Sequence, residues 1–218
     1  MKKCLFPAIF AAWILCPGCA SSYIKVLQRK GPTTPFTNIF AFYISEACNF
    51  SFADSTGYNI CLKAGFDDSK TVEERGRVER LITSTMGTPG TRIYSASELM
   101  GVNADGTSPD NSYNRFRKLV DSLHIDGILV VQMHHLQKEY YKVPVSGVPV
   151  GLPGVGVQVT KELDNAAFDC YLIEPRGLNS SVWAAALETK GASPHHELNK
   201  SMTHMLAKSL TDDGYIVH

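Results

Sequence analysis

The alternation of apolar and polar positions divides most of the chain into strands and helices. Residues 36–45 are dense in aromatic and β-branched side chains and predict a buried strand. Residues 71–86 repeat apolar side chains at helical spacing and predict a helix. A short strand is expected over residues 91–94, followed by one helical turn in which Ser95 and Glu98 fit a capping box.

The clearest amphipathic helix places Tyr113, Phe116, Val120 and Leu123 on one face. It leads directly into residues 125–133, whose continuous apolar centre predicts an interior strand that is covered on both faces. This pairing of a helix with a buried strand is typical of a sheet on which helices pack.

The carboxyl-terminal part predicts an antiparallel hairpin followed by a last helix. Residues 165–173 and 181–189 alternate apolar and polar side chains and predict two strands. Leu198, Met202 and Leu206 share one face of a predicted helix, which ends at Gly214. The sequence therefore predicts a single α/β (α+β) domain over residues 36–218: a mixed sheet of about five to six strands, with three main helices packed on it.

Residues 143–159 (VPVSGVPVGLPGVGVQV) form the most unusual segment. Its prolines cannot donate to a β-ladder, so it predicts an extended excursion or a lobe at a sheet edge. An exposed strip that is apolar and low in charge is a candidate contact surface, and a self-packed loop is the alternative. The candidate partner-contact residues come from this strip and from the aromatic loop that begins near residue 48: Val145, Val148, Val150, Leu152, Val155, Phe50 and Phe52.

The amino terminus predicts export. Lys2 and Lys3 precede an apolar run over residues 5–15 that is too short to span a bilayer, as in a secretory signal. A redox or zinc role for Cys16 and Cys19 lacks the βαβ pattern or the second ligand pair that such sites need. The stretch resembles the bacterial lipoprotein signal, in which a small residue, here Gly18, precedes the cysteine that receives lipid.

The lipoprotein resemblance implies an anchored mature protein. Residues 1–18 would be the signal peptide, Cys19 would carry several acyl chains such as palmitate, and residues 19–35 would form a tether rich in Ser, Lys, Thr and Pro. Ala20 after the cysteine implies the outer membrane, facing the periplasm or the cell surface. A conventional cut near Ala20 is the alternative, because Cys16 stands where such signals usually carry Leu.

Charge and cysteine content narrow the function further. Loss of Lys2 and Lys3 leaves 19 of the 21 basic side chains against 21 acidic ones, a formal charge of −2. The sequence contains no basic stripe of the kind that binds nucleic acid, so no nucleic-acid partner is expected. Cys48 and Cys61 flank a turn and are the candidate disulfide, with two unpaired buried thiols as the alternative. Cys170 alternates with apolar neighbours and is expected to be a buried free thiol.

No arrangement of residues predicts catalysis, a metal or a cofactor. His134 and His135 are adjacent on a strand and point to opposite faces, and neither a Gly-x-Ser-x-Gly elbow nor a phosphate-binding loop is found. Trp183 on the hairpin is expected to be a core residue. Two alternatives remain: a cleft that binds a small ligand or a metal near residues 134–141, and an unrecognised hydrolase.

One further resemblance concerns the fold. The amphipathic helix that feeds LHIDGILVV at residues 123–131, the hairpin with Ser181-Val-Trp183 and the terminal helix resemble the amino-terminal domain of the translocation protein TolB and envelope auxiliary lipoproteins that share its fold. The resemblance covers residues 36–214. It implies a non-enzymatic lipoprotein that acts in periplasmic or outer-membrane assembly or transport, through contacts with an envelope protein whose identity the sequence does not give.

Overall fold

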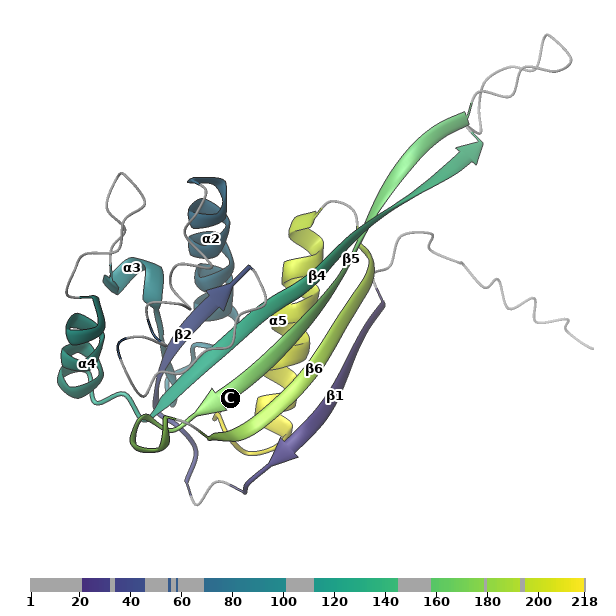
Figure 1. Ribbon diagram of the computed structural model, residues 1–218. Helices are drawn as coiled ribbons and strands as arrows, with labels where there is room; N and C mark the ends of the chain where they lie inside the picture. The colour runs from purple at the N-terminus through teal and green to yellow at the C-terminus, as the bar shows by residue number, and fades with distance from the viewer. Residues whose placement is uncertain are drawn as a thin grey trace, which may run out of the picture.

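The computed structural model describes residues 21–31, 34–45, 55, 58, 69–100, 112–144, 158–178, 180–192 and 195–217. Figure 1 shows these elements as one sheet with helices packed against it. In chain order they are β1 (Ser21–Arg29), β2 (Asn38–Ile44), α2 (Ser69–Met86), β3 (Arg92–Ser95), α3 (Ala96–Met100), α4 (Ser112–Ser122), β4 (Gly127–Pro144), β5 (Gln158–Ile173), the 3-10 turn η1 (Pro175–Gly177), β6 (Ser181–Ala192) and α5 (His195–Asp212).

Within the described residues, six strands form one sheet in the order β1-β6-β5-β4-β2-β3. β2 is parallel to both β3 and β4, and every other neighbouring pair is antiparallel. The parallel pairs result from the helical crossovers, because parallel strands need a long connection. The predicted mixed sheet with three main helices in a single α+β domain is confirmed.

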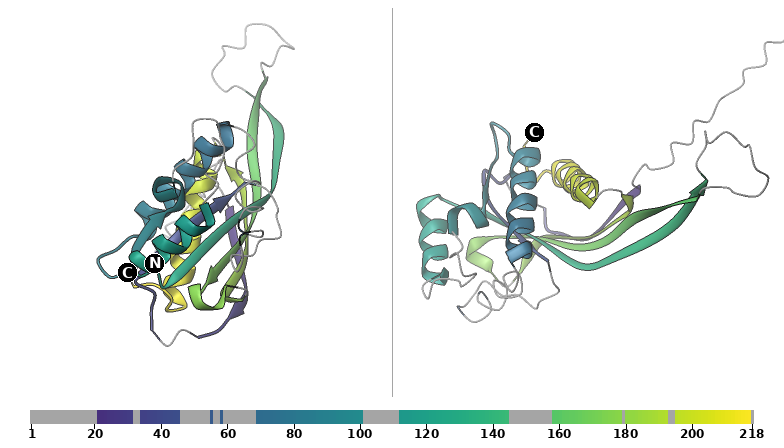
Figure 2. Two further views of the ribbon diagram at one scale, coloured as in Figure 1. Left: turned by 60° about the vertical axis from the view of Figure 1, so that its left-hand side comes forward. Right: turned by 90° about the horizontal axis from the view of Figure 1, so that it is seen from above.

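The sheet is covered on two faces near β2 and β4. Along β2, Ile39 and Tyr43 belong to the main core under α2 and α5, while Phe40 and Phe42 belong to a second core with α3 and α4. Successive side chains of a strand point to opposite faces, so the two cores lie on opposite sides of the sheet. The prediction of an interior strand is confirmed in β4, where Leu129 joins the main core and Ile128 and Val130 join the second. Figure 2 gives two further views of the sheet and its helices.

The last helix and the hairpin agree with the sequence pattern. β5 and β6 pair antiparallel, and Leu198, Met202 and Leu206 of α5 are fully buried against the sheet. Gly214 ends α5 with φ +78°, a conformation that costs glycine little. The Tyr215 N–H donates to the Leu210 carbonyl at 2.9 Å, which closes a Schellman motif.

The tether expected over residues 19–35 is wrong for Ser21–Arg29, which form the edge strand β1. β1 pairs antiparallel with β6, and Ile24 and Val26 pack against the main core. Burial alternates along β1, with Ser22, Ile24, Val26 and Gln28 partly buried and the residues between them exposed, which is the pattern of a half-buried strand. The polar composition of the segment concealed an alternation that only the pairing with β6 makes evident.

β4 and β5 are longer than the sequence predicts. β4 continues past residue 133 to Pro144, and β5 begins at Gln158, so both strands run into the segment that was expected to be an excursion. Pro144 stands at the last position of β4, where a missing N–H leaves the ladder intact. Residues 145–157 lie outside the described part of the chain.

Candidate functional site

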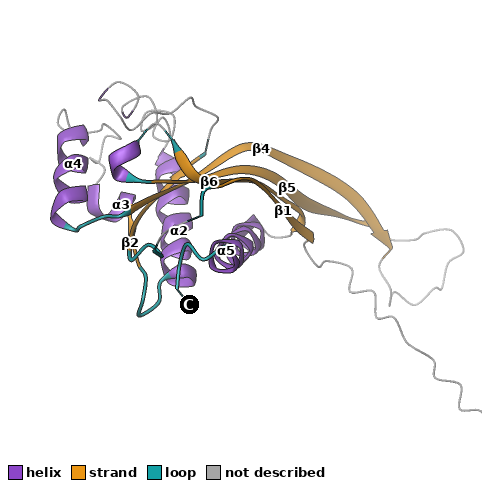
Figure 3. Cartoon of the chain, turned by 90° about the horizontal axis from the view of Figure 1, so that it is seen from below, coloured by secondary structure: helices purple, strands orange, loops and turns teal. Residues whose placement is uncertain are grey.

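A hairpin arm extends from the body of the domain. We define the arm as residues 136–144 of β4 and 158–166 of β5, which pair continuously from Leu136 opposite Ala166 to Pro144 opposite Gln158. The neighbouring strand β6 ends at Ala192, which pairs with Asp164. Beyond that pair, no other strand of the described residues lies beside β4 and β5, and Figures 1 and 3 show them running past the helices.

The root of the arm is fixed where β6 leaves the sheet. The Asn165 Oδ1 accepts a hydrogen bond of 2.9 Å from the backbone N–H of Gly191. Gly191 has φ +77°, a left-handed conformation that other residues rarely adopt. Gly191 is the last residue but one of β6, and β4 and β5 continue beyond this point.

The described side chains of the outer arm face solvent. Leu136 is 40% exposed and Tyr140 is 65% exposed, which makes them two of the most exposed large apolar residues in the described part of the chain. Gln137, Glu139 and Thr160 are also exposed. A two-stranded ribbon is only marginally stable in water by itself. Asp164 and Ala166 at the root of the arm are buried, and the exposed residues beyond them are suited to contact something outside the domain.

The start of β1 lies at the same end of the sheet as the arm. Ser21 pairs with Lys190 near the end of β6, and β1 runs antiparallel to β6 and so in the same direction as β5. The hydroxyl groups of Ser22 and Ser201 are hydrogen-bonded, which joins the beginning of β1 to α5. The first described residues are thus held firmly to the domain.

Most residues that the sequence singled out for function lie outside the described residues, so their predicted roles stay predictions. These are the lipidation candidate, the disulfide candidates and the partner-contact candidates: Cys19, Cys48, Cys61, Phe50, Phe52, Val145, Val148, Val150, Leu152 and Val155. The arm nevertheless brings the two residues that flank segment 145–157 side by side, because Pro144 and Gln158 are directly paired.

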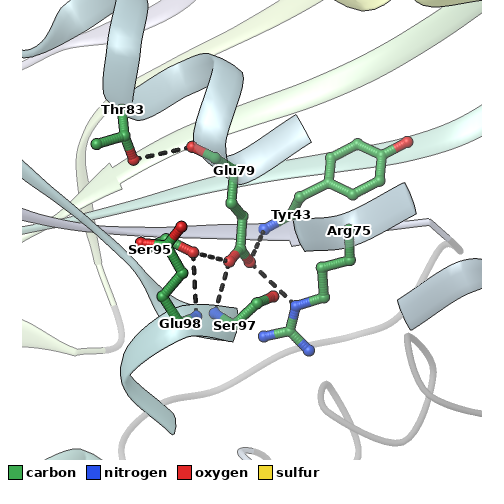
Figure 4. Close-up of polar contacts among 7 residues, drawn as sticks. All are labelled: Tyr43, Arg75, Glu79, Thr83, Ser95, Ser97 and Glu98. Atoms are coloured by element: carbon green, nitrogen blue, oxygen red, sulfur yellow. Dashed lines mark hydrogen bonds and ion pairs between the residues drawn. The ribbon is translucent and has the colours of Figure 1, made fainter. Parts of the chain in front are cut away.

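The most elaborate polar cluster surrounds the buried carboxylate of Glu79 (Figure 4). One oxygen accepts from the Tyr43 N–H and from Arg75 Nε, each at 3.0 Å. The other accepts from the Ser95 hydroxyl at 2.8 Å and from the Ser97 N–H at 2.6 Å. Four donors from β2, α2, β3 and α3 therefore converge on one side chain, which joins these elements.

Ser95 also forms its half of the predicted capping box. Its Oγ accepts from the Glu98 N–H at 3.2 Å while its hydroxyl donates to Glu79. The sequence indicated the local cap but not the buried acid behind it, because Glu79 lies far along the chain. A glutamate in an otherwise apolar stripe of a helix is the only signal that the sequence carries for this cluster.

The histidines are not gathered in the described structure. His134 and His135 occupy β4 at a register shift beside Met133, and His204 is exposed on α5. Among the described residues, no three His, Cys, Asp or Glu side chains are placed to share a metal ion. Residues 134–141, where the sequence left a ligand cleft open as an alternative, lie in β4, at the root of the arm and along it.

An open cavity of about 1170 Å³ lies at the opposite end of the domain. It is lined by α4, by η1 and by the segment before β2, and it combines Phe36 and Val120 with the charged side chains of Arg117, Asp121 and Arg176. None of its lining residues belongs to the arm. Basic and acidic groups both occur on its walls, so its charge does not select one class of ligand.

Two further side chains are placed as expected. Trp183 is fully buried, and its indole N–H donates to Asp213 Oδ2 at 2.9 Å. Arg29 Nε donates to the same oxygen at 2.9 Å, so this acid joins β1, β6 and the end of α5. Cys170 is a buried free thiol, and burial raises its pKa far above the usual range.

No protein-family model and no curated protein sequence matches the chain. Among solved structures, two of the PelC dodecamer from Paraburkholderia phytofirmans are similar at 12% and 10% identity, with TM-scores of 0.42 and 0.43. Each match covers 90% of this chain and 98% or 100% of the PelC chain. The lipoprotein GNA1162 from Neisseria meningitidis is similar at 11% identity and a TM-score of 0.34, over 81% of this chain and 96% of that one.

Similarity at these values assigns neither a family nor a function to the chain. The resemblance to the TolB amino-terminal domain stays a prediction. The function of the protein has to be inferred from its own residues and their geometry.

Proposed function

We propose that this chain is a lipid-anchored protein of the bacterial cell envelope that acts without catalysis, through protein contacts in periplasmic or outer-membrane assembly or transport. The observation that carries the proposal is the position of Ser21, which opens β1 two residues after the cysteine of the lipoprotein motif. The folded domain thus begins where the mature chain of a lipoprotein would begin. None of the helices in the described part of the chain has the length and hydrophobicity to span a bilayer.

The organised carboxylates support a non-catalytic role. Asp126 accepts hydrogen bonds from the Thr37 N–H and hydroxyl, each at 2.8 Å, and from the Asn38 N–H at 2.9 Å. Glu79 and Asp213 are likewise engaged with donors from several elements. A general acid or base needs to exchange a proton with a substrate. Carboxylates that hold strands and helices together in this way are suited to structural work.

The anchor is tested by a matched pair of cysteine substitutions. Cys19→Ser should abolish incorporation of labelled palmitate and release the protein from the membrane fraction. Cys16→Ser should leave both unchanged, because Cys16 belongs to the part that is removed. Labelling that survives in Cys19→Ser, or that disappears in Cys16→Ser, would contradict the proposed site.

Protein contacts are tested by replacing residues 145–157 with an Asn-Gly turn. Pro144 and Gln158 are paired, so a two-residue turn can close the hairpin without changing its register. Crosslinking in native membranes should then lose the partner captured by the parental protein, while acylation and folding persist. Capture of the same partner at the same yield would remove this segment from the contact surface.

A further inference from the structure

The register of the sheet fixes the level along the arm at which β1 begins. Ser21 pairs with Lys190, Gly191 contacts Asn165, and Asn165 pairs with Gln137, so β1 begins at the level of Gln137. Cys19 lies two residues before Ser21, and an extended chain spans at most about 3.6 Å per residue. The cysteine is therefore within about 7 Å of the start of β1.

The arm extends further than that reach. From residue 138 to Pro144, β4 advances about 3.3 Å per residue, which carries the arm roughly 20 Å past the level of Ser21. The arm leaves the body at the end of the sheet where β1 begins, because β1 and β5 both run from this end into the body. Figure 1 shows the arm leaving the domain at the end where β1 starts.

We propose that the arm lies against the lipid bilayer that holds the Cys19 anchor, with Tyr140 at the membrane–water interface. The inference rests on the proposed acylation of Cys19, since acyl chains keep that residue at the bilayer surface. With Ser21 held within about 7 Å of that surface, an arm that continues about 20 Å past the level of Ser21 is long enough to reach the headgroup region.

The chemistry of the arm suits a headgroup region. β4 ends in the sequence YYKVP over residues 140–144, which combines tyrosines with a lysine. Tyrosine is enriched at membrane interfaces because its ring is apolar and its hydroxyl is polar. The described side chains of Leu136 and Tyr140 are exposed on one strand face, which leaves both available to a lipid surface.

The backbone of the arm also tolerates this environment. β4 and β5 exchange ladder hydrogen bonds along their whole common length, which leaves only the outward edges of the ribbon to be solvated. Such edges can be hydrated in the headgroup region, whereas the hydrocarbon core would leave them unsatisfied. The arm is therefore expected to lie at the interface and not to cross the bilayer. A partner of residues 145–157 is accordingly one that reaches or spans the same membrane.

Depth-dependent quenching of tryptophan fluorescence tests the contact. The acylated full mature protein is reconstituted in vesicles of phosphatidylethanolamine and phosphatidylglycerol whose acyl chains carry bromine. Tyr140→Trp and, on the paired strand, Thr160→Trp report on the arm, since both positions are exposed. Val217→Trp is the matched control, because Val217 is 44% exposed and lies beyond the end of α5 that is remote from the arm. The parental protein supplies the signal of buried Trp183.

Bromine should reduce the fluorescence of the two arm variants and leave the control and the parental protein unchanged. Equal fluorescence in brominated and unbrominated vesicles at both arm positions, with acyl chains confirmed by mass, overturns the membrane contact and leaves the proposed function standing. Absence of acyl chains overturns both. A photo-reactive residue at position 140 in native membranes distinguishes lipid from protein as the contact of the arm. Capture of lipid supports the membrane contact, and capture of a single protein overturns it.

Discussion

The side chain of Asn165 accepts a hydrogen bond from the backbone of Gly191 at the point where β6 ends and the arm continues alone. Two residues that are distant in sequence thus meet at the root of the arm, one residue before the end of β6 at Ala192. The root of the arm is consequently the most direct place to test the fold.

Gly191→Ala should destabilise the domain by about 1–2 kcal/mol, because a side chain disfavours the left-handed conformation. A Cβ at this position would meet no atom within 4 Å, so the expected loss is conformational and not steric. Gly31→Ala is the matched control, since Gly31 has an open Cβ position and no positive φ. Urea unfolding measures the difference in unfolding free energy between the two variants. Equal stabilities would contradict the left-handed conformation assigned to Gly191.

Glu79→Ala should cost about 3–5 kcal/mol of unfolding free energy, because it leaves the buried Arg75 without its ionic partner. The Tyr43 and Ser97 N–H groups would lose their acceptor as well. Glu73→Ala provides the control, since Glu73 pairs with Arg77 on the exposed side of the same helix and should change stability little. Chemical denaturation compares them. A small effect of Glu79→Ala would mean that the cluster does not join the four elements.

Ile24→Ala should destabilise the domain by about 1 kcal/mol, because Ile24 packs partly buried against the main core. Lys25→Ala should have almost no effect, since Lys25 is exposed on the opposite face of β1. Amide exchange provides a second measurement: the β1 amides that pair with β6 should be protected in the parental protein. Fast exchange throughout β1 would restore the tether that the sequence predicted.

The stability of the domain should fall as the pH rises above 9. Burial raises the folded-state pKa of Cys170 above its ordinary value of 9.0, so above that pH the unfolded chain loses the thiol proton while the folded chain keeps it. The stabilising contribution is complete below pH 9.0 and is lost with further increase, by up to about 1.4 kcal/mol per pH unit.

Cys170→Ala is the control for this pH dependence. Its free energy of unfolding should depend less on pH between 9 and 10 than that of the parental protein. Above pH 10, Tyr43 and Tyr58 contribute as well, because burial raises the folded-state pKa of both phenols above the ordinary value of 10.0. Denaturation at a series of pH values measures the slopes. Identical slopes for the two proteins would show that the thiol is accessible in the folded state.

Local pattern was enough to predict most elements. The apolar run of β4 and the alternation of Phe168, Cys170 and Leu172 indicated buried strands, and Gly214 indicated a helix end. β1 was missed because its apolar residues fall on both faces, with Ile24 and Val26 against the core and Tyr23 and Leu27 exposed, so only pairing with β6 distinguishes the segment from a linker. The Glu79 cluster and the Asn165–Gly191 contact were missed because both depend on residues brought together by the fold.

The length of the arm shows a related limit. Pro144 ends β4, an interior strand of the sheet, at a position where only β5 lies beside it, and local pattern does not report how many neighbours a strand has at each position. The register of six strands supplied that information. The relation between the arm and the anchor could therefore be drawn only after β1 had been placed in the sheet.

The mass of the amino-terminal peptide of the mature protein tests the account most directly. We predict a peptide that begins at Cys19 and carries acyl chains on that residue, two positions before Ser21 at the start of β1. A peptide that begins at another residue, or a Cys19 without lipid, would contradict the anchor and with it the placement of the arm at the bilayer.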